Sequence, residues 1–275
     1  MAGRLYLCAT PIGNLDDVSR RLADVLGSVS VVYAEDTRRV RTLLDAVGVS
    51  VEVRSHFTGN EASRAAEILR RLEAGDDVAV VTDAGAPGVS DPGVLAVDRA
   101  HEAGIPVSVV AGPSAVTASL AVAGFPADRF VFEGFLPRRG GERSRRLVDL
   151  AGESRTMVVF ASPHRLLVDL DDLAEVMGGE RRICVCRELT KLHEEVARST
   201  ISEAATEWRN REPRGEYTLV IEGAVAATPT LDEATGLAAR LVEEGQSRSA
   251  AAREAARTTG VARRSIYEAL GEDRS

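Results

Sequence analysis

The chain has 275 residues, of which 44% are hydrophobic and 28% are charged. This length favours two domains with an appendage, and this composition excludes collagen-like, low-complexity and largely disordered chains. The net charge of −8 excludes a protein coated in positive charge for non-specific nucleic-acid binding. No apolar run approaches the roughly 20 residues that cross a bilayer, and the first residues lack a signal-peptide core, which predicts a cytoplasmic protein with no membrane partner.

The first 112 residues alternate short β-rich runs with longer helical patterns. The strand candidates are rich in valine and bounded by turn residues, and they span 4–9, 29–34, 77–82 and 106–110. The helical candidates carry apolar residues at helical spacing, and they span 18–26, 38–47, 61–74 and 94–103. This alternation predicts an α/β domain over residues 1–112 with a mostly parallel sheet.

A second cycle of the same kind predicts another α/β domain over residues 113–226. Its strand candidates span 129–133, 156–160, 182–187 and 217–222. Its helical candidates span 115–123, 142–150, 164–177 and 202–210. The order of elements is typical of a second layered α/β unit.

The remainder, residues 227–275, is predicted to be a small helical appendage. Residues 224–233 are a candidate linker, and helices are expected over 234–244, 249–258 and 262–270. The last two of these helices, with Gly260 at the turn between them, resemble a helix-turn-helix. In isolation, this module would indicate a DNA-binding regulator.

Functional loops of α/β sheets gather beyond the carboxyl ends of the strands. After the first strand, Pro11 and Gly13 fix a tight turn that lacks the glycine spacing of a dinucleotide fold. After the second, AEDTR at 34–38 is either a helix cap or a polar site. After the third, TDAGAPGVSDPG at 82–93 is a long ordered turn suited to a small polar ligand. After the fourth, Ser114 caps a helix or meets a ligand there.

These loops together resemble the tetrapyrrole methylase superfamily, which uses S-adenosylmethionine. The motifs that carry this resemblance are TPIGNLDD, AEDTR, TDAGAPGVSDPG and AGPSA. Four later motifs are more similar to the ribosomal RNA small subunit methyltransferase I family, namely FEGFLPR at 132–138, SPHRLL at 162–167, RELTK at 187–191 and GEYTLVIEG at 215–223. That family methylates the ribose 2′-oxygen of a cytidine in the decoding centre of small-subunit (16S) ribosomal RNA.

The resemblance implies an S-adenosylmethionine site in a cleft between the two α/β domains, a homodimer, and no metal. The implied cofactor contacts are Ile12, Asp83, Gly85, Ala86, Ser114, Ala115 and, near the adenine, Leu219. Asp83 and Asp91 have an alternative role as side chains that lock the loop in Asx turns, and for Asp91 this alternative is favoured.

Lys191 is the only lysine among the 34 basic residues of the chain. A lysine loses its charge when desolvated and an arginine does not, so Lys191 is a candidate catalytic residue that accepts the proton of a ribose hydroxyl or orients that hydroxyl. Glu188, Glu35 and Asp36 are alternative bases, and an accidental surface lysine is the structural alternative.

Two arginine-rich segments, 138–146 and 245–265, each hold five arginines and one glutamate within an otherwise acidic chain. They are predicted to contact RNA phosphates, and the first, with Gly140 and Gly141, is predicted to be a flexible RNA-gripping loop. The predicted RNA contacts are Arg138, Arg139, Arg143, Arg145, Arg146, Arg263 and Arg264. These segments favour small-subunit ribosomal RNA, or the assembled subunit, over a precorrin-like tetrapyrrole as the substrate. A ligand-sensing transcription regulator that acts through its last 45 residues stays an alternative.

The cysteines are odd in number, and each lies in an apolar strand-like run. Cys8, Cys184 and Cys186 are therefore predicted to be buried and unbridged, which excludes a disulfide framework.

Overall fold

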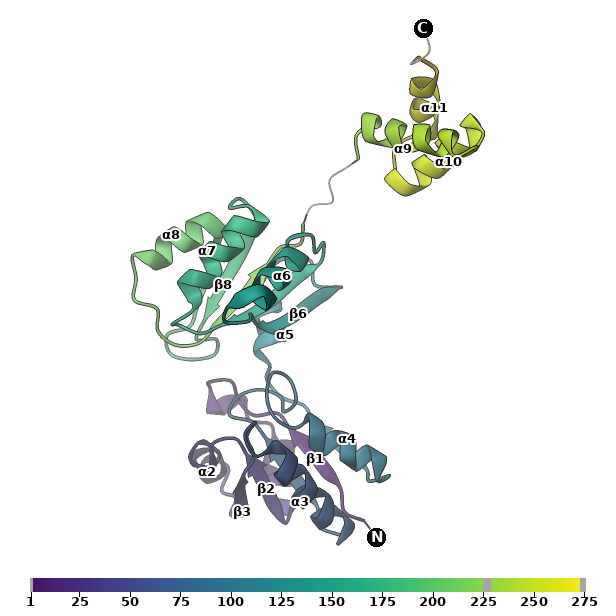
Figure 1. The fold of residues 1–275 in the computed structure, drawn as a ribbon. Helices are drawn as coiled ribbons and strands as arrows, with labels where there is room; N and C mark the ends of the chain where they lie inside the picture. The colour runs from purple at the N-terminus through teal and green to yellow at the C-terminus, as the bar shows by residue number, and fades with distance from the viewer. Residues whose placement is uncertain (1, 225–228, 273–275) are drawn as a thin grey trace. The chain divides into compact units, whose positions relative to one another are not determined.

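The computed structural model describes residues 2–224 and 229–272 (Figure 1). Its contacts divide the chain into two compact units, Met1–Ala224 and Val225–Ser275. Of the predicted linker 224–233, residues 225–228 lie outside the described residues, and Leu231 already begins a helix.

The first unit contains two five-stranded sheets. The strands of the first sheet are β1 (Leu5–Cys8), β2 (Val31–Ala34), β3 (Glu52–Ser55), β4 (Val78–Val81) and β5 (Val107–Val110). They are all parallel, in the order β3-β2-β4-β1-β5. The prediction of a mostly parallel α/β sheet is therefore confirmed. The edge strand β3 was not predicted because its charged residues, Glu52 and Arg54, break the apolar pattern of a buried strand.

Helices cover both faces of this sheet, namely α1 (Arg20–Ser28), α2 (Thr37–Ala46), α3 (Glu61–Glu73) and α4 (Val94–Glu102). Alternate residues along β1 explain how, because successive side chains of a strand point to opposite faces. Leu5 and Leu7 pack with α3 and α4 on one face, whereas Cys8 packs with α1 and α2 on the other. Figure 1 shows α3 and α4 lying along the sheet.

The second sheet is mixed. Its strands are β6 (Phe130–Phe135), β7 (Thr156–Ala161), β8 (Arg182–Arg187), β9 (Glu195–Thr200) and β10 (Tyr217–Ile221). The order is β6-β7-β10-β8-β9, in which only the β6–β7 pair is parallel. The edge strand β9 was also missed, because its sequence EVARST contains the charged residues Glu195 and Arg198 and has no apolar run.

The helices of this second half are α5 (Ala115–Ala123), α6 (Gly140–Ala151), α7 (Leu166–Met177) and α8 (Ile201–Arg209). One core joins α6, α7 and α8 to the sheet and contains the fully buried Trp208. Another core joins α5 to the opposite face and includes Ile12 from the loop after β1. The turn 10–17 thus packs directly against the second sheet.

The predicted RNA-gripping loop at 138–146 is wrong in two respects. Helix α6 begins at Gly140, so most of the segment is helical. Arg143 is 6% exposed, and its guanidinium pairs with Asp169 at 2.7 Å and Asp172 at 2.6 Å and donates to the Pro137 carbonyl oxygen at 2.9 Å. Asp169, a buried acid on α7, therefore pairs with the Arg143 guanidinium that was predicted to contact phosphate.

The second unit is a three-helix module made of α9 (Leu231–Glu243), α10 (Arg248–Thr259) and α11 (Arg263–Glu272). Among the residues described, its fully buried core consists of alanines and Ile266, with larger apolar side chains such as Leu237 and Leu241 partly buried against it. Gly260 ends α10 in the left-handed conformation at φ 75°, as the turn requires. The helical appendage is therefore confirmed, and both Arg263 and Arg264 are exposed on it.

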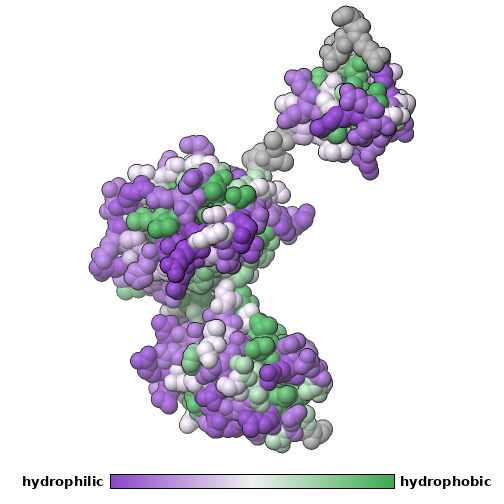
Figure 2. Space-filling view, in the orientation of Figure 1, coloured by the Kyte–Doolittle hydropathy of each residue, from purple (hydrophilic) through white to green (hydrophobic). Residues whose placement is uncertain are grey.

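The three cysteines are all buried and free, as predicted. Within the described ranges, no helix has both the length and the apolar character needed to span a membrane. The face drawn in Figure 2 is mostly hydrophilic, and its hydrophobic side chains form only small patches.

Candidate cofactor-binding and catalytic site

Two loops that leave neighbouring strands of the first sheet are tied to each other. β1 and β4 are adjacent and parallel, so the turn 10–17 and the loop 82–93 leave the same edge. Thr10 and Gly85 exchange two backbone hydrogen bonds of 2.9 and 3.1 Å, and the Thr10 hydroxyl donates to the Thr82 carbonyl oxygen. Gly85 has φ 81°, a conformation that favours glycine. The two loops therefore form one rigid edge.

The far end of loop 82–93 is anchored by a helix of the same domain. Glu61 at the start of α3 accepts a hydrogen bond of 3.0 Å from the Gly93 amide, which precedes α4. Gly93 has φ 140°, and a Cβ there would lie 3.4 Å from the Gly88 nitrogen. The loop is thus held at both ends, and its two segments pack closely where Gly88 meets Gly93, so its backbone groups keep fixed positions.

A cavity of about 350 Å³ opens between this edge and the second sheet. Its walls come from loop 82–93, the start of α5, and strands β6, β7, β8 and β10. Six of the seven predicted cofactor contacts line it, namely Ile12, Asp83, Gly85, Ala86, Ser114 and Ala115. A volume of this size is within the range of small-molecule sites.

The seventh predicted contact, Leu219, does not line this cavity with its side chain. Leu219 is fully buried in the core shared with α7 and α8, on the opposite face of the sheet from α5. Its neighbours on β10, Tyr217 and Thr218, line the cavity instead. The structure thus brings the neighbours of Leu219 on the same strand, and not its side chain, to the cavity.

One wall of the larger cavity is acidic. Burial raises the pKa of Asp91 to about 6, a hydrogen bond with Thr82 opposes this rise, and the charges of Glu35 and Asp83 add to it. Burial, and then the neighbouring Asp83, also raise the pKa of Glu35. Carboxylates packed this closely favour a cationic ligand, because a positive charge relieves their repulsion. Asp91, whose loop-locking role was favoured, therefore also faces the cavity.

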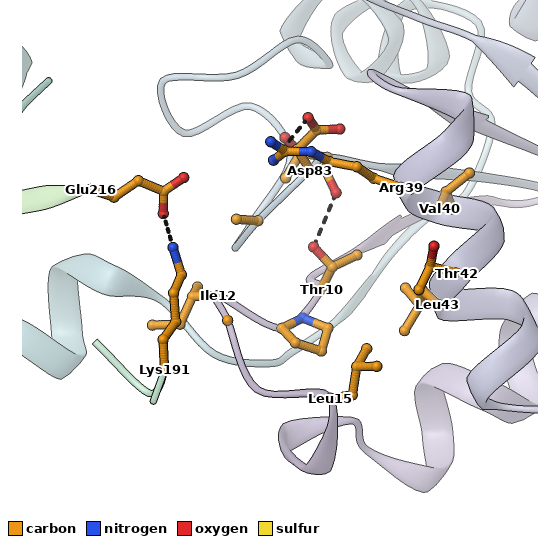
Figure 3. A pocket seen from close by; sticks show the side chains of 14 residues that line it. Thr10, Ile12, Leu15, Arg39, Val40, Thr42, Leu43, Asp83, Lys191 and Glu216 are labelled. Atoms are coloured by element: carbon orange, nitrogen blue, oxygen red, sulfur yellow. Dashed lines mark hydrogen bonds and ion pairs between the residues drawn. The ribbon is translucent and has the colours of Figure 1, made fainter. Parts of the chain in front are cut away.

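A smaller cavity of about 180 Å³ adjoins the first one (Figure 3). Five residues line both cavities, namely Ile12, Arg39, Asp83, Ala84 and Glu216. Figure 3 shows two ion pairs facing this space, Arg39 with Asp83 and Lys191 with Glu216. The first pair comes from the first sheet's domain, and the second from the other domain.

Lys191 lies between two carboxylates. Its Nζ donates to Glu188 Oε1 at 2.8 Å and to Glu216 Oε2 at 2.9 Å. Burial lowers the pKa of Lys191, but the two hydrogen-bonded carboxylates outweigh burial, so the net shift is upward. The stem of Lys191 crosses Gly13, where a Cβ would lie 2.3 Å from its Cγ. Lys191 is therefore a protonated contact between the two domains, which disfavours it as a base.

The three alternative bases do not line either cavity. Glu188 Oε1 is occupied by Lys191 and by the amide of Glu216 at 2.9 Å. Asp36 is the N-cap of α2, and hydrogen bonds from Arg38 lower its pKa to about 2. Glu35 lies behind the cavity wall, within 3.4 Å of the Thr82 hydroxyl. Only Lys191 among the four candidates faces a cavity.

Sequence reasoning missed several residues that line the larger cavity, namely Arg39, Ser90, Phe135, Phe160, Cys186, Glu216 and Tyr217. Phe135 lies within FEGFLPR, and Glu216 and Tyr217 lie within GEYTLVIEG, so the motifs pointed to these segments without selecting the residues. Arg39 offered no separate signal, because it is one of three arginines on α2.

The larger cavity fits S-adenosylmethionine in its chemistry. Phe135, Phe160 and Leu189 offer apolar surface to an adenine, and the acidic wall suits a sulfonium and an ammonium group. At the start of α5, Ser114 is the N-cap residue, yet its side chain makes no cap hydrogen bond to the described residues. Its hydroxyl is therefore available to a ligand, as the alternative to capping requires.

Comparisons with known proteins identify the class. The family model of tetrapyrrole (corrin/porphyrin) methylases matches residues 4–205. Two solved structures share the fold: the uroporphyrin-III-C-methyltransferase of Thermus thermophilus (TM-score 0.58, 19% identity, covering 80% of this chain and 94% of the other) and the cobalt precorrin-4 methyltransferase (TM-score 0.60, 19% identity, 80% and 94%). Fold and site together define a methyltransferase that uses S-adenosylmethionine.

Curated relatives narrow this class. A ribosomal RNA small subunit methyltransferase I of Mycobacterium tuberculosis (strain CDC 1551 / Oshkosh) is 43% identical over 99% of this chain and 96% of its own length. A Thermotoga maritima protein of the same name is 44% identical over 80% of this chain and 99% of its own length. The chain belongs to the tetrapyrrole methylases and, among them, to the ribosomal RNA small subunit methyltransferase I family.

Proposed function

We propose that this enzyme transfers a methyl group from S-adenosylmethionine to the ribose 2′-oxygen of a cytidine in the decoding centre of 16S ribosomal RNA. The observation that carries the proposal is the similarity at 43% identity to a small-subunit rRNA methyltransferase, which extends over 99% of this chain. We place the reaction in the cytoplasm, on free RNA or on the small subunit.

A tetrapyrrole substrate is less well supported. The solved tetrapyrrole enzymes are 19% identical to this chain, which is evidence of shared fold alone. Exposed arginines support RNA instead: Arg138, Arg139 and Arg145 follow β6, whose last residue, Phe135, lines the larger cavity. A phosphate backbone passing this edge would meet positive charge.

The chain's own residues account for most of what the reaction needs. When bound, S-adenosylmethionine supplies an electrophilic methyl group. The rigid loops 10–17 and 82–93 fix the donor site, and orientation of this kind is the main contribution an enzyme makes to an in-line displacement. The aromatic side chains of Phe135 and Phe160 line the larger cavity and offer apolar surface to the donor. A group that accepts the hydroxyl proton must lie where the substrate enters.

The proposed homodimer has support from two exposed apolar side chains. Val109 on the edge strand β5 is 61% exposed, and Val122 on α5 is 46% exposed. An unpaired strand edge with apolar side chains is a surface that a second copy can cover.

A methyl-transfer assay with a cavity-filling variant tests this function. We expect the purified enzyme to methylate small ribosomal subunits or 16S RNA but not DNA or a precorrin, with 2′-O-methylcytidine as the labelled nucleoside. Ala115→Leu should fill the cavity and abolish both cofactor binding and transfer. Ala121→Leu, the same change at an exposed site of α5, is the matched control and should retain both. Methylation of the precorrin alone would overturn the proposal.

A further inference from the structure

Among the acidic residues of the second domain that the structure describes, Glu216 alone lines both cavities. It directly precedes β10, the central strand of the second sheet. Asp83 is the other acid that lines both, but Asp83 Oδ1 accepts from the Asp36 amide at 2.9 Å and Oδ2 lies 3.4 Å from Arg39. Glu216 is the less engaged carboxylate at the junction of the two cavities.

Only one oxygen of the Glu216 carboxylate is occupied. Oε2 accepts the hydrogen bond from Lys191, whereas Oε1 accepts none from the residues that the structure describes. The side chain is 65% exposed, so a substrate can reach it. This carboxylate is fixed on one side and open on the other (Figure 3).

The residues around Glu216 hold its carboxylate in place, and two of them have strained backbone conformations. Glu188 and Thr190 have φ values of 50° and 67°, which non-glycine residues adopt rarely. Gly215 has φ 86°, and a Cβ there would lie 2.5 Å from the Glu188 carboxylate. Glu188 in turn binds both Lys191 and the Glu216 amide. The RELTK and GEYTLVIEG motifs thus combine into one charged cluster, Glu188–Lys191–Glu216.

We propose that Glu216 is a catalytic residue that accepts the proton of the substrate hydroxyl, and that Lys191 is the positioning residue that holds its carboxylate. This inference rests on the proposed function. In the step, the ribose oxygen forms a bond to the methyl carbon while the bond from that carbon to sulfur breaks. The electron pair of the broken bond stays on sulfur, and the hydroxyl proton passes to Glu216 Oε1.

The role of the single lysine changes accordingly. A cation held between two carboxylates orients them and reduces their mutual repulsion, and it does not need to lose its proton. An arginine at 191 preserves the charge, whereas a methionine preserves only the stem that packs on Gly13. The two substitutions therefore separate a positioning cation from a base.

The test measures single-turnover methyl transfer to 16S RNA, with binding of S-adenosylhomocysteine and RNA measured separately. We expect Glu216→Gln to reduce the transfer rate by about 10²-fold or more, with both binding constants unchanged. Formate should partly restore Glu216→Ala but not Glu216→Gln, because only the smaller side chain leaves room for a carboxylate. Glu212→Gln, at an exposed glutamate that lines neither cavity, is the control and should be fully active.

Lys191 variants complete the test. Lys191→Arg should retain more transfer than Lys191→Met, whereas a catalytic base at 191 would make the two equally inactive. Near-normal transfer by Glu216→Gln, or a loss explained by weaker binding, would overturn the inference. The proposed function fails separately, if the wild-type enzyme itself leaves 16S RNA unmethylated.

Discussion

Two groups of charged residues in the first unit, one centred on the buried Arg143 and one half-buried around Thr82, differ in how their charges are balanced. In the second domain, Arg143 pairs with Asp169 and Asp172 between α6 and α7. In the first domain, Glu35, Asp83 and Asp91 gather around Thr82. Among the described residues of this domain, Arg39 is the one cation that lines a cavity, and it lies 3.4 Å from Asp83. The balanced group links two helices, whereas the unbalanced group faces a cavity.

This difference separates structural from functional use of charge. A buried charge is costly unless it is paired, so an incompletely paired group persists where a ligand completes it. The balanced group should therefore respond to mutation through stability, and the acidic group through ligand binding and pH.

The largest effect is expected from removing the balancing cation. Arg143→Met leaves Asp169, 5% exposed, with only the more distant Arg165 at 3.6 Å, so the free energy of unfolding should fall by about 3–5 kcal/mol. Denaturant unfolding measures this. Arg145→Met, two residues along on the exposed side of α6, is the matched control, with a change of about 0.5 kcal/mol or less. Adding Asp169→Leu to Arg143→Met should recover stability; without recovery, the pair is not the cause.

The acidic group should give cofactor binding a pH dependence. Because the pKa of Asp91 is about 6, this carboxyl is charged at pH 7.5 and protonated at pH 5. S-adenosylmethionine carries a sulfonium and should bind more weakly at pH 5, by up to about tenfold, equivalent to one unit of pKa. S-adenosylhomocysteine lacks that charge and should depend less on pH. Calorimetry of both ligands measures the difference, and Asp91→Asn should remove it.

In the unliganded protein, the raised pKa of Asp91 makes the folded state more stable at low pH, which is the opposite of its effect on cofactor binding. A carboxyl whose pKa is raised in the folded state favours folding when protonated. The contribution of Asp91 to stability is therefore fully present below about pH 4, and it is lost as the pH rises through about 6. If acidification weakened both ligands equally, Asp91 would not act on the sulfonium.

How much of this site could be predicted follows from what local sequence encodes. Strand exits and glycine-rich turns are local features, so the sequence could select the loops with Ile12, Gly85 and Ser114, which line the larger cavity. The ion pair of the buried Arg143 joins it to Asp169, 26 positions further along the chain, and no local pattern predicts such a pair. The side of β10 to which Leu219 points could not be predicted, because helices cover both faces of this sheet and every residue of the strand is buried.

The fold shows the same limit. Buried strands were located from their valine-rich runs, whereas the charged edge strands β3 and β9 were missed because their pairing depends on neighbours distant in sequence. Lys191 was singled out by composition alone, but its two carboxylate partners, and hence its protonated state, required the three-dimensional arrangement.

The smallest effects concern the exposed arginines, which remain predicted RNA contacts. Each phosphate contact steepens the dependence of log K on log salt by about 0.7 to 0.9. Replacing Arg138, Arg139 and Arg145 by alanine should therefore flatten the slope of log K against log salt for RNA binding by up to about 2 to 3. Replacing Arg263 and Arg264 should flatten it by up to about 2.

The Arg70→Ala variant, at an exposed position near the end of α3, is the control and should leave the slope unchanged. Equal slopes for the wild type and the triple variant would remove the segment after β6 from the RNA interface and leave only the helical unit to supply positive charge.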